Sequence, residues 1–199
     1  QNLMSDELIN RAEPDQAANS ESGAPPKTVE NRLVPAFEML SSQAGRLALE
    51  IFDGTQALHG LGLESRVILE TAGKLHSLPV QQSKKKPFTA ALKLVNAQTG
   101  IDLDDQGRRL LAAVLLSLQG RIKNRELVDL GFSSAQQQEI MTITVILQTA
   151  EGFFRICGEA AAIKRIVEFE DELWIVLSGP QANPDLSPLG KVTGQWQKL

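Results

Sequence analysis

The chain has 199 residues, 42% of them hydrophobic and 22% charged, which is enough for one well-packed core. Its formal net charge of −4 and its 5% aromatic content, with no tyrosine, argue against indiscriminate DNA binding and against a base-stacking surface, so no nucleic-acid partner is expected. One cysteine, Cys157, excludes an internal disulfide framework and indicates a reducing, cytoplasmic compartment.

The beginning of the chain is predicted to be a separate segment, residues 1–31. Residues 12–29 are rich in Pro, Ser, Ala, Gly, Asn and Glu and bury too little apolar surface to offset the entropy of ordering, so they read as a linker. No basic stretch followed by an apolar core is visible at the start, and we see no apolar run of the roughly 18 residues that a membrane span needs. We therefore expect no membrane association.

The middle of the chain, residues 32–160, is predicted to be a multi-helix domain. Apolar residues recur there at spacings of three and four, which predicts helices near residues 33–40, 47–58, 64–76, 88–95, 110–118 and 133–154. Asp102 or Asp104 is expected to cap the helix over 110–118, and Ser133 with Gln136 fits a capping box. The helix over 110–118 is apolar almost all round, which predicts a central position.

The end of the chain, residues 161–199, is predicted to be a small β-hairpin with a tail packed on the helices. Apolar residues alternate over 163–169 and again over 173–177, as expected for two half-buried strands. Val192 and Trp196 are the apolar residues expected to anchor the tail. The predicted fold class is therefore mainly α, with one C-terminal hairpin.

Charge is unevenly distributed along the chain. Residues 84–125 hold nine basic and three acidic side chains, so this segment has a net charge of +6 and the remainder −10. Such asymmetry is typical of an anion-binding face, although the same pattern also fits solvated loops and helix faces. The candidate anion-binding residues are Lys84, Lys85, Lys86, Arg108, Arg109, Arg121, Lys123 and Arg155.

Several short strings resemble one known family. They are LALEIFD at residues 47–53, LHGLG at 58–62, the helix ending in Leu75-His76, the apolar run 110–118 and ILQTAEG at 146–152. This pattern over residues 32–199 resembles the C-terminal helical domain of the exopolyphosphatase and guanosine pentaphosphate phosphohydrolase family. The resemblance implies an HD-like fold, in which His and Asp side chains hold divalent metals.

The resemblance also implies that the metal site is degenerate. His76 and Glu151 are the two positions that keep a ligand-type side chain, and we interpret them as vestigial. The other expected ligand positions are occupied by Leu40, Ser77, Thr89 and Leu118. We therefore predict no catalytic residue, metal or cofactor, and interpret His76 as a hydrogen-bonded core residue, His59 as a turn residue and Cys157 as a buried thiol.

The resulting hypothesis is a non-catalytic accessory or regulatory domain. In the family, phosphoanhydride hydrolysis belongs to preceding actin-like domains, whose glycine-rich phosphate loops this sequence lacks. Candidate partners are polyphosphate, (p)ppGpp, and actin-like phosphatase domains on the same or another chain. Two alternatives stay open: a protein-interaction or homodimerisation module, and a divergent metal-dependent phosphohydrolase that uses His76 and Glu151.

Overall fold

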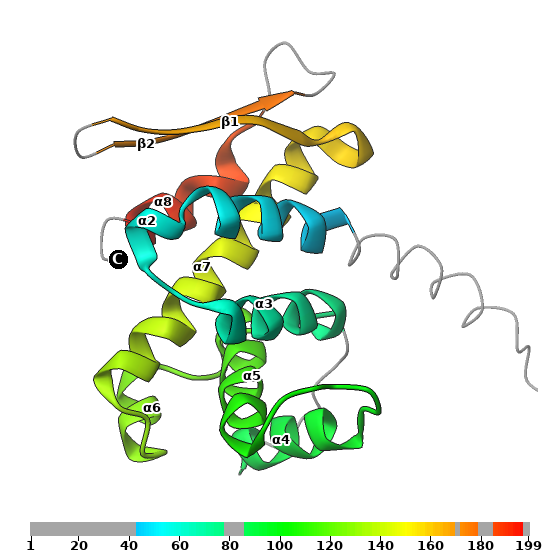
Figure 1. Ribbon diagram of the computed structural model, residues 1–199, viewed down its shortest axis with the longest axis vertical. Coiled ribbons are helices and arrows are strands. Elements are labelled where there is room, and N and C mark those ends of the chain that lie inside the picture. Colours follow the sequence, from blue (N-terminus) through cyan, green and yellow to red (C-terminus); the bar gives the residue numbers. More distant parts are fainter. Residues whose placement is uncertain (1–42, 78–85, 170–171, 179–184, 197–199) are drawn as a thin grey trace, which may run out of the picture.

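The computed structural model describes residues 43–77, 86–169, 172–178 and 185–196. This part of the chain is mainly helical and ends in a two-stranded antiparallel hairpin, which confirms the predicted fold class. In Figure 1 the longest described helix, α7, runs from the level of α6 to the level of the hairpin, and α4 lies beside α5 at the end away from the hairpin. The predicted helix over 33–40 and the boundary at residue 32 lie outside the described residues.

Most of the described helices precede the hairpin along the chain, and one short helix follows it. A first helix covers residues 43–54. The later helices are α2 (Gln56–His59), α3 (Leu63–Leu75), α4 (Pro87–Ala97), α5 (Asp105–Leu118), α6 (Asn124–Asp129), α7 (Ser134–Cys157) and α8 (Gly190–Trp196). Two 3₁₀ turns, η1 (Gly158–Ala160) and η2 (Ser187–Leu189), flank the strands β1 (Ala162–Phe169) and β2 (Glu172–Ser178).

The predicted helix starts are confirmed at atomic level. Asp104, rather than Asp102, is the N-cap of α5: its Oδ1 accepts a hydrogen bond from the backbone N–H of Gly107 at 2.6 Å. At α7 the Ser133 hydroxyl accepts the Gln136 N–H at 3.3 Å, and the Gln136 side chain accepts the Ser133 N–H at 2.9 Å. Both caps satisfy backbone donors that a helix start leaves without partners.

The core forms around α5 and α7. Every residue from Leu110 to Leu116 is buried, which confirms the central position predicted for this helix. α5 packs against α3, α4 and α7, and α7 contributes Ile140, Ile143, Ile146 and Leu147 to the same core. A helix that is apolar on most of its circumference is stable in water only when neighbours cover it on several sides.

The helix over residues 43–54 crosses α3 at two glycines. A Cβ placed on Gly73 would lie only 3.2 Å from the Cα of Gly45, so the close backbone approach depends on glycine at this crossing. The same two helices are tied by Arg66, which donates from Nε to Asp53 Oδ1 at 2.8 Å and from Nη2 to Asp53 Oδ2 at 2.9 Å. This bidentate pair fixes the crossing on the solvent side.

The hairpin packs one face on the helices and leaves the other exposed. Residues that pair directly across an antiparallel ladder lie on the same face of the sheet. The inner face holds Ile163 opposite Leu177 and Ile166 opposite Ile175; a Cβ on Gly54 would collide with Ile166. The outer face carries Val167 opposite Trp174, and Phe169 opposite Glu172. A register shift between Ile163 and Arg165 marks a bulge in β1.

The Asp53–Arg66 pair predicts a pH dependence of stability. The hydrogen bond from Arg66 holds the pKa of Asp53 below its ordinary value of 3.8. A lowered folded-state pKa means that the stabilisation is complete above the ordinary value and is lost as the pH falls through the lowered one. In urea unfolding at about pH 5, Arg66→Gln should lower the free energy of unfolding by less than about 1 kcal/mol. At about pH 2, where Asp53 is protonated, the same substitution should leave the free energy of unfolding unchanged.

The small size follows from solvent screening, because the two side chains are 35% and 53% exposed. Arg125→Gln is the matched control, since it removes an exposed guanidinium that makes no ion pair within the described residues. An unchanged pH profile in Arg66→Gln would show that the pair contributes nothing to folding.

Candidate functional site

His76 and Glu151, the two positions interpreted above as vestigial ligands, are brought together by the fold. His76 follows the last turn of α3, and Glu151 lies on α7. The imidazole Nε2 lies 3.2 Å from Glu151 Oε1, and its Nδ1 lies 2.7 Å from the carbonyl oxygen of Gly73. The side chains are 15% and 26% exposed, so the contact is largely shielded from water.

Arg155, one turn further along α7, completes this cluster. Its Nη2 lies 3.5 Å from Glu151 Oε2, while most of the side chain, 70%, is exposed. Both ring nitrogens of His76 therefore face oxygen atoms, Nδ1 the Gly73 carbonyl and Nε2 the Glu151 carboxylate. An Nδ1–H that donates to a backbone carbonyl is also the usual orientation of a metal-binding imidazole, so the other ligand positions decide what this pair can hold.

The other expected ligand positions add nothing to a metal centre. Ser77 and Leu118 are half-buried and Thr89 is exposed, while Leu40 lies outside the described residues. Across the ranges that the structure describes, no three His, Cys, Asp or Glu side chains converge as they would around a metal ion. A hydrolytic metal normally needs three protein ligands and an open position.

His59 is held in a turn rather than in a reactive site. Its Nδ1 accepts the Leu61 N–H at 3.0 Å, so the proton of the neutral ring is on Nε2, which lies 3.0 Å from the carbonyl oxygen of Phe52. The ring also contacts the Phe52 ring, with centroids 4.5 Å apart. Both nitrogens are therefore used locally, in keeping with the turn role predicted for His59. Cys157 is half-buried rather than fully buried.

Two of the predicted phosphate-binding residues are used inside the fold. Arg108 donates to the carbonyl oxygens of Ile101 and Leu103, at 2.9 and 3.1 Å, and so holds the loop before α5. Arg109 donates to the Leu130 carbonyl at 2.9 Å. The Arg109 guanidinium also lies 5.8 and 5.5 Å from two ring centroids, those of Phe88 and Phe132. These contacts leave each guanidinium fewer donors for a ligand.

The remaining predicted cations are spread out. Lys84 and Lys85 lie outside the described residues; Lys86 and Lys123 are exposed and Arg121 is half-buried. The start of α6 lies beside α7 near Met141, since Asn124 Nδ2 is 3.1 Å from Met141 Sδ. Arg155 comes fourteen residues later on α7, a distance of about 21 Å along the helix axis. Lys123 and Arg155 therefore do not face one ligand of nucleotide size.

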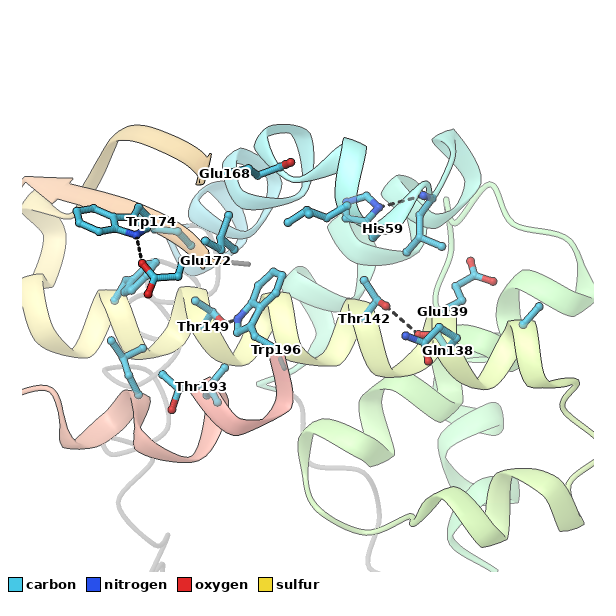
Figure 2. A pocket seen from close by; sticks show the side chains of 18 residues that line it. His59, Gln138, Glu139, Thr142, Thr149, Glu168, Glu172, Trp174, Thr193 and Trp196 are labelled. Atoms are coloured by element: carbon cyan, nitrogen blue, oxygen red, sulfur yellow. Dashed lines mark hydrogen bonds between the residues drawn. The ribbon is translucent and has the colours of Figure 1, made fainter. Parts of the chain in front are cut away.

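A groove of 1020 Å³ that sequence reasoning missed runs beside α7. Its walls come from α2 and the following loop, from α7, from the end of the hairpin and from α8 (Figure 2). Gln138 and Glu139 lie toward one end, Glu172 and Trp174 toward the other, and Trp196 between them. Both tryptophans of the chain line this groove, a pairing that appears only once the hairpin and α8 are placed in space.

Comparisons with known proteins leave the family open. No family model matches the chain, and no curated protein and no solved structure matches it either. The stretch Ser134–Ala160 is long and apolar enough to cross a membrane, with a mean hydropathy of 1.3, a stretch that the sequence reading missed. Because 67% of its apolar window is buried inside the fold, the apolar character is accounted for by core packing.

The His76–Glu151 contact predicts a measurable coupling. His76→Ala and Glu151→Gln should each lower the free energy of unfolding by about 1–3 kcal/mol, because each leaves a largely buried polar partner unpaired. The double variant should lose less than the two single losses together, by at least about 0.5 kcal/mol. Urea unfolding of the four proteins measures this cycle. Arg155→Gln, at an exposed position, should change stability by less than about 0.5 kcal/mol; strictly additive losses would contradict the coupling.

Proposed function

We propose that this chain is a non-catalytic accessory domain, of the kind that the exopolyphosphatase resemblance implies. The observation that carries the proposal is the contact between His76 and Glu151. The two side chains that the resemblance assigns to metal ligation lie 3.2 Å apart, Nε2 to Oε1, and His76 Nδ1 also contacts the Gly73 carbonyl. Such a contact gives both side chains a partner at the α3–α7 junction without a metal.

The chemistry of phosphoanhydride cleavage gives the same expectation. A metal in an HD-like site polarises phosphate and activates a bound water, which requires several ligands and an open position. Within the described ranges no such group of ligands exists. Hydrolysis would then come from actin-like domains, on this polypeptide or a neighbouring one, and this domain would bind or regulate.

The metal-free proposal is tested by element analysis of protein purified without chelator. We expect far less than one equivalent of transition metal per chain, and no phosphate release from polyphosphate or pppGpp after Mn²⁺ or Mg²⁺ is added. The melting temperature of the protein should also stay unchanged when these ions are added, because binding at a specific site would stabilise the folded state. One equivalent of metal that His76→Ala removes would restore the phosphohydrolase hypothesis.

Polyphosphate is the ligand that we propose for the basic segment, ahead of (p)ppGpp. The exposed cations Lys86 and Lys123 and the charge of +6 over residues 84–125 attract polyanions. A small nucleotide gains most from several cations that converge on one phosphate cluster. A long flexible polyanion can instead contact separated cations in turn, which suits their spread over several elements.

Polyphosphate binding should be electrostatic and local to this segment. We expect the dissociation constant of a labelled long-chain polyphosphate to rise steeply between about 50 and 300 mM salt, because the contacts are exposed to screening. Replacing Lys84, Lys85 and Lys86 together by Gln should weaken binding several-fold. Replacing Lys164 and Arg165, exposed basic residues of β1, should have little effect. Absence of binding at low salt, or binding indifferent to salt, would refute the proposal.

A further inference from the structure

We infer that the groove beside α7 is a docking site for an extended, cationic peptide segment of a partner protein, which adds as a strand to the free edge of β2. This inference goes beyond the proposed function and uses none of the residues assigned to polyphosphate. Three features of the described residues support it: the orientation of β2, the length of the groove and the charge of its walls.

The groove is bordered by both faces of β2 and, on the inner face, by Glu168 of β1, which pairs with Leu173. Side chains of successive strand residues point to opposite faces of a sheet. Four successive residues, Glu172 to Ile175, nevertheless line the groove, so both faces of β2 border it. Within the described residues the sheet consists of β1 and β2 alone, which leaves β2 a strand edge without a partner. A free edge presents backbone donors and acceptors to an incoming strand.

The dimensions favour a peptide over a small metabolite. Lining residues on α7 extend from Ala135 to Phe153, eighteen positions, or about 27 Å along the helix. An extended chain rises about 3.3 Å per residue, so a segment of about eight residues spans this length, and about half of it would lie beside Glu172–Ile175. The volume of 1020 Å³ lies at the upper limit of the roughly 300–1,000 Å³ usual for small-molecule pockets.

The side chains that line the groove favour a positively charged ligand. Among the described residues, three carboxylates, those of Glu139, Glu168 and Glu172, line the groove, and no lysine or arginine does. None of the three forms an ion pair within the part of the chain that the structure describes. Glu139 accepts a hydrogen bond from the Ser65 hydroxyl, and Glu172 accepts one from the Trp174 indole. The carboxylates would repel a polyanion or a nucleic acid, whereas Lys or Arg side chains of a ligand would form ion pairs with them.

The two indoles add a preference for cations. Trp174 Nε1 donates to Glu172 Oε2 at 2.7 Å, and the Trp174 side chain remains 58% exposed. Trp196 Nε1 donates to the Thr149 hydroxyl at 2.9 Å (Figure 2). Each N–H is thus satisfied inside the groove, which holds the rings in place. A guanidinium over the face of Trp174 would meet both the aromatic quadrupole and the neighbouring carboxylate.

The experiment uses the full chain and an eight-residue peptide in which Arg alternates with Val. Both tryptophans of the chain line the groove and the peptide contains none, so intrinsic fluorescence reports binding at this place. We expect saturable binding at low salt. Glu168→Gln with Glu172→Gln should weaken it about tenfold, since each exposed pair contributes a factor of about two to five. Glu159→Gln, an exposed carboxylate outside the groove, should leave the dissociation constant unchanged.

Two further peptides separate the parts of the proposal. A peptide with Glu in place of Arg should not bind, and a version with alternate backbone nitrogens methylated should bind at least tenfold more weakly, because strand addition needs those N–H groups. Equal binding of the Glu peptide would mean non-specific apolar contact and would overturn the inference, as would equal binding of the methylated peptide. Self-association seen by light scattering and relieved by the double glutamine variant would instead assign the groove to a second copy.

Discussion

The burial of α7 is the constraint on which the rest of the fold depends. This helix has 24 residues, and half of them are buried, including an unbroken run from Thr142 to Leu147. Such a helix exposes too much apolar surface to exist alone. The elements α3, α5, α6, α8 and both 3₁₀ turns therefore contact it, each covering a different part of its length.

The same constraint explains the polar residues on α7. Buried threonines would cost stability if their hydroxyls lacked partners. Thr144 and Thr149 donate to the carbonyls of Ile140 and Val145, both at 2.7 Å, one turn back on the same helix. Glu151 instead uses a partner on another element, His76. The contact gives each of the two side chains a polar partner where α3 meets α7.

Local and periodic features were predictable from the sequence. Asp104 and the Ser133–Gln136 pair are short-range caps, and the run from Leu110 to Leu118 shows its central position by composition. Alternation marks the two strands, but it did not show the bulge that puts Val167 and Phe169 on the opposite face from Ile163. α6 was missed because it has six residues and buries only Leu127, too few for any periodicity to appear.

The groove and the uses of Arg108 and Arg109 were not predictable. The groove and the use of Arg109 depend on contacts between residues far apart in sequence, whereas Arg108 donates to carbonyls five and seven positions away that no periodic pattern marks. Arg109 reaches Leu130, and Trp196 reaches Thr149 across 47 positions. A basic residue in a sequence can serve a ligand or a backbone carbonyl equally well, and only the fold decides between them. His76 and Glu151, 75 positions apart, are placed in one site by the family resemblance alone, because no local pattern links them.

The uneven distribution of charge along the chain can be related to the positions of the charged residues in the fold. The carboxylates of the groove belong to the part of the sequence with net charge −10, and the exposed lysines to the part with +6. A single surface of mixed sign would bind neither class of ligand well, because each would meet like charges. The separation is only partial in space, because Lys123 precedes α6, whose start contacts α7 at Met141, next to the groove residue Thr142. Under the two proposals, a polyanion and a cationic segment would be attracted by different side chains of the same domain.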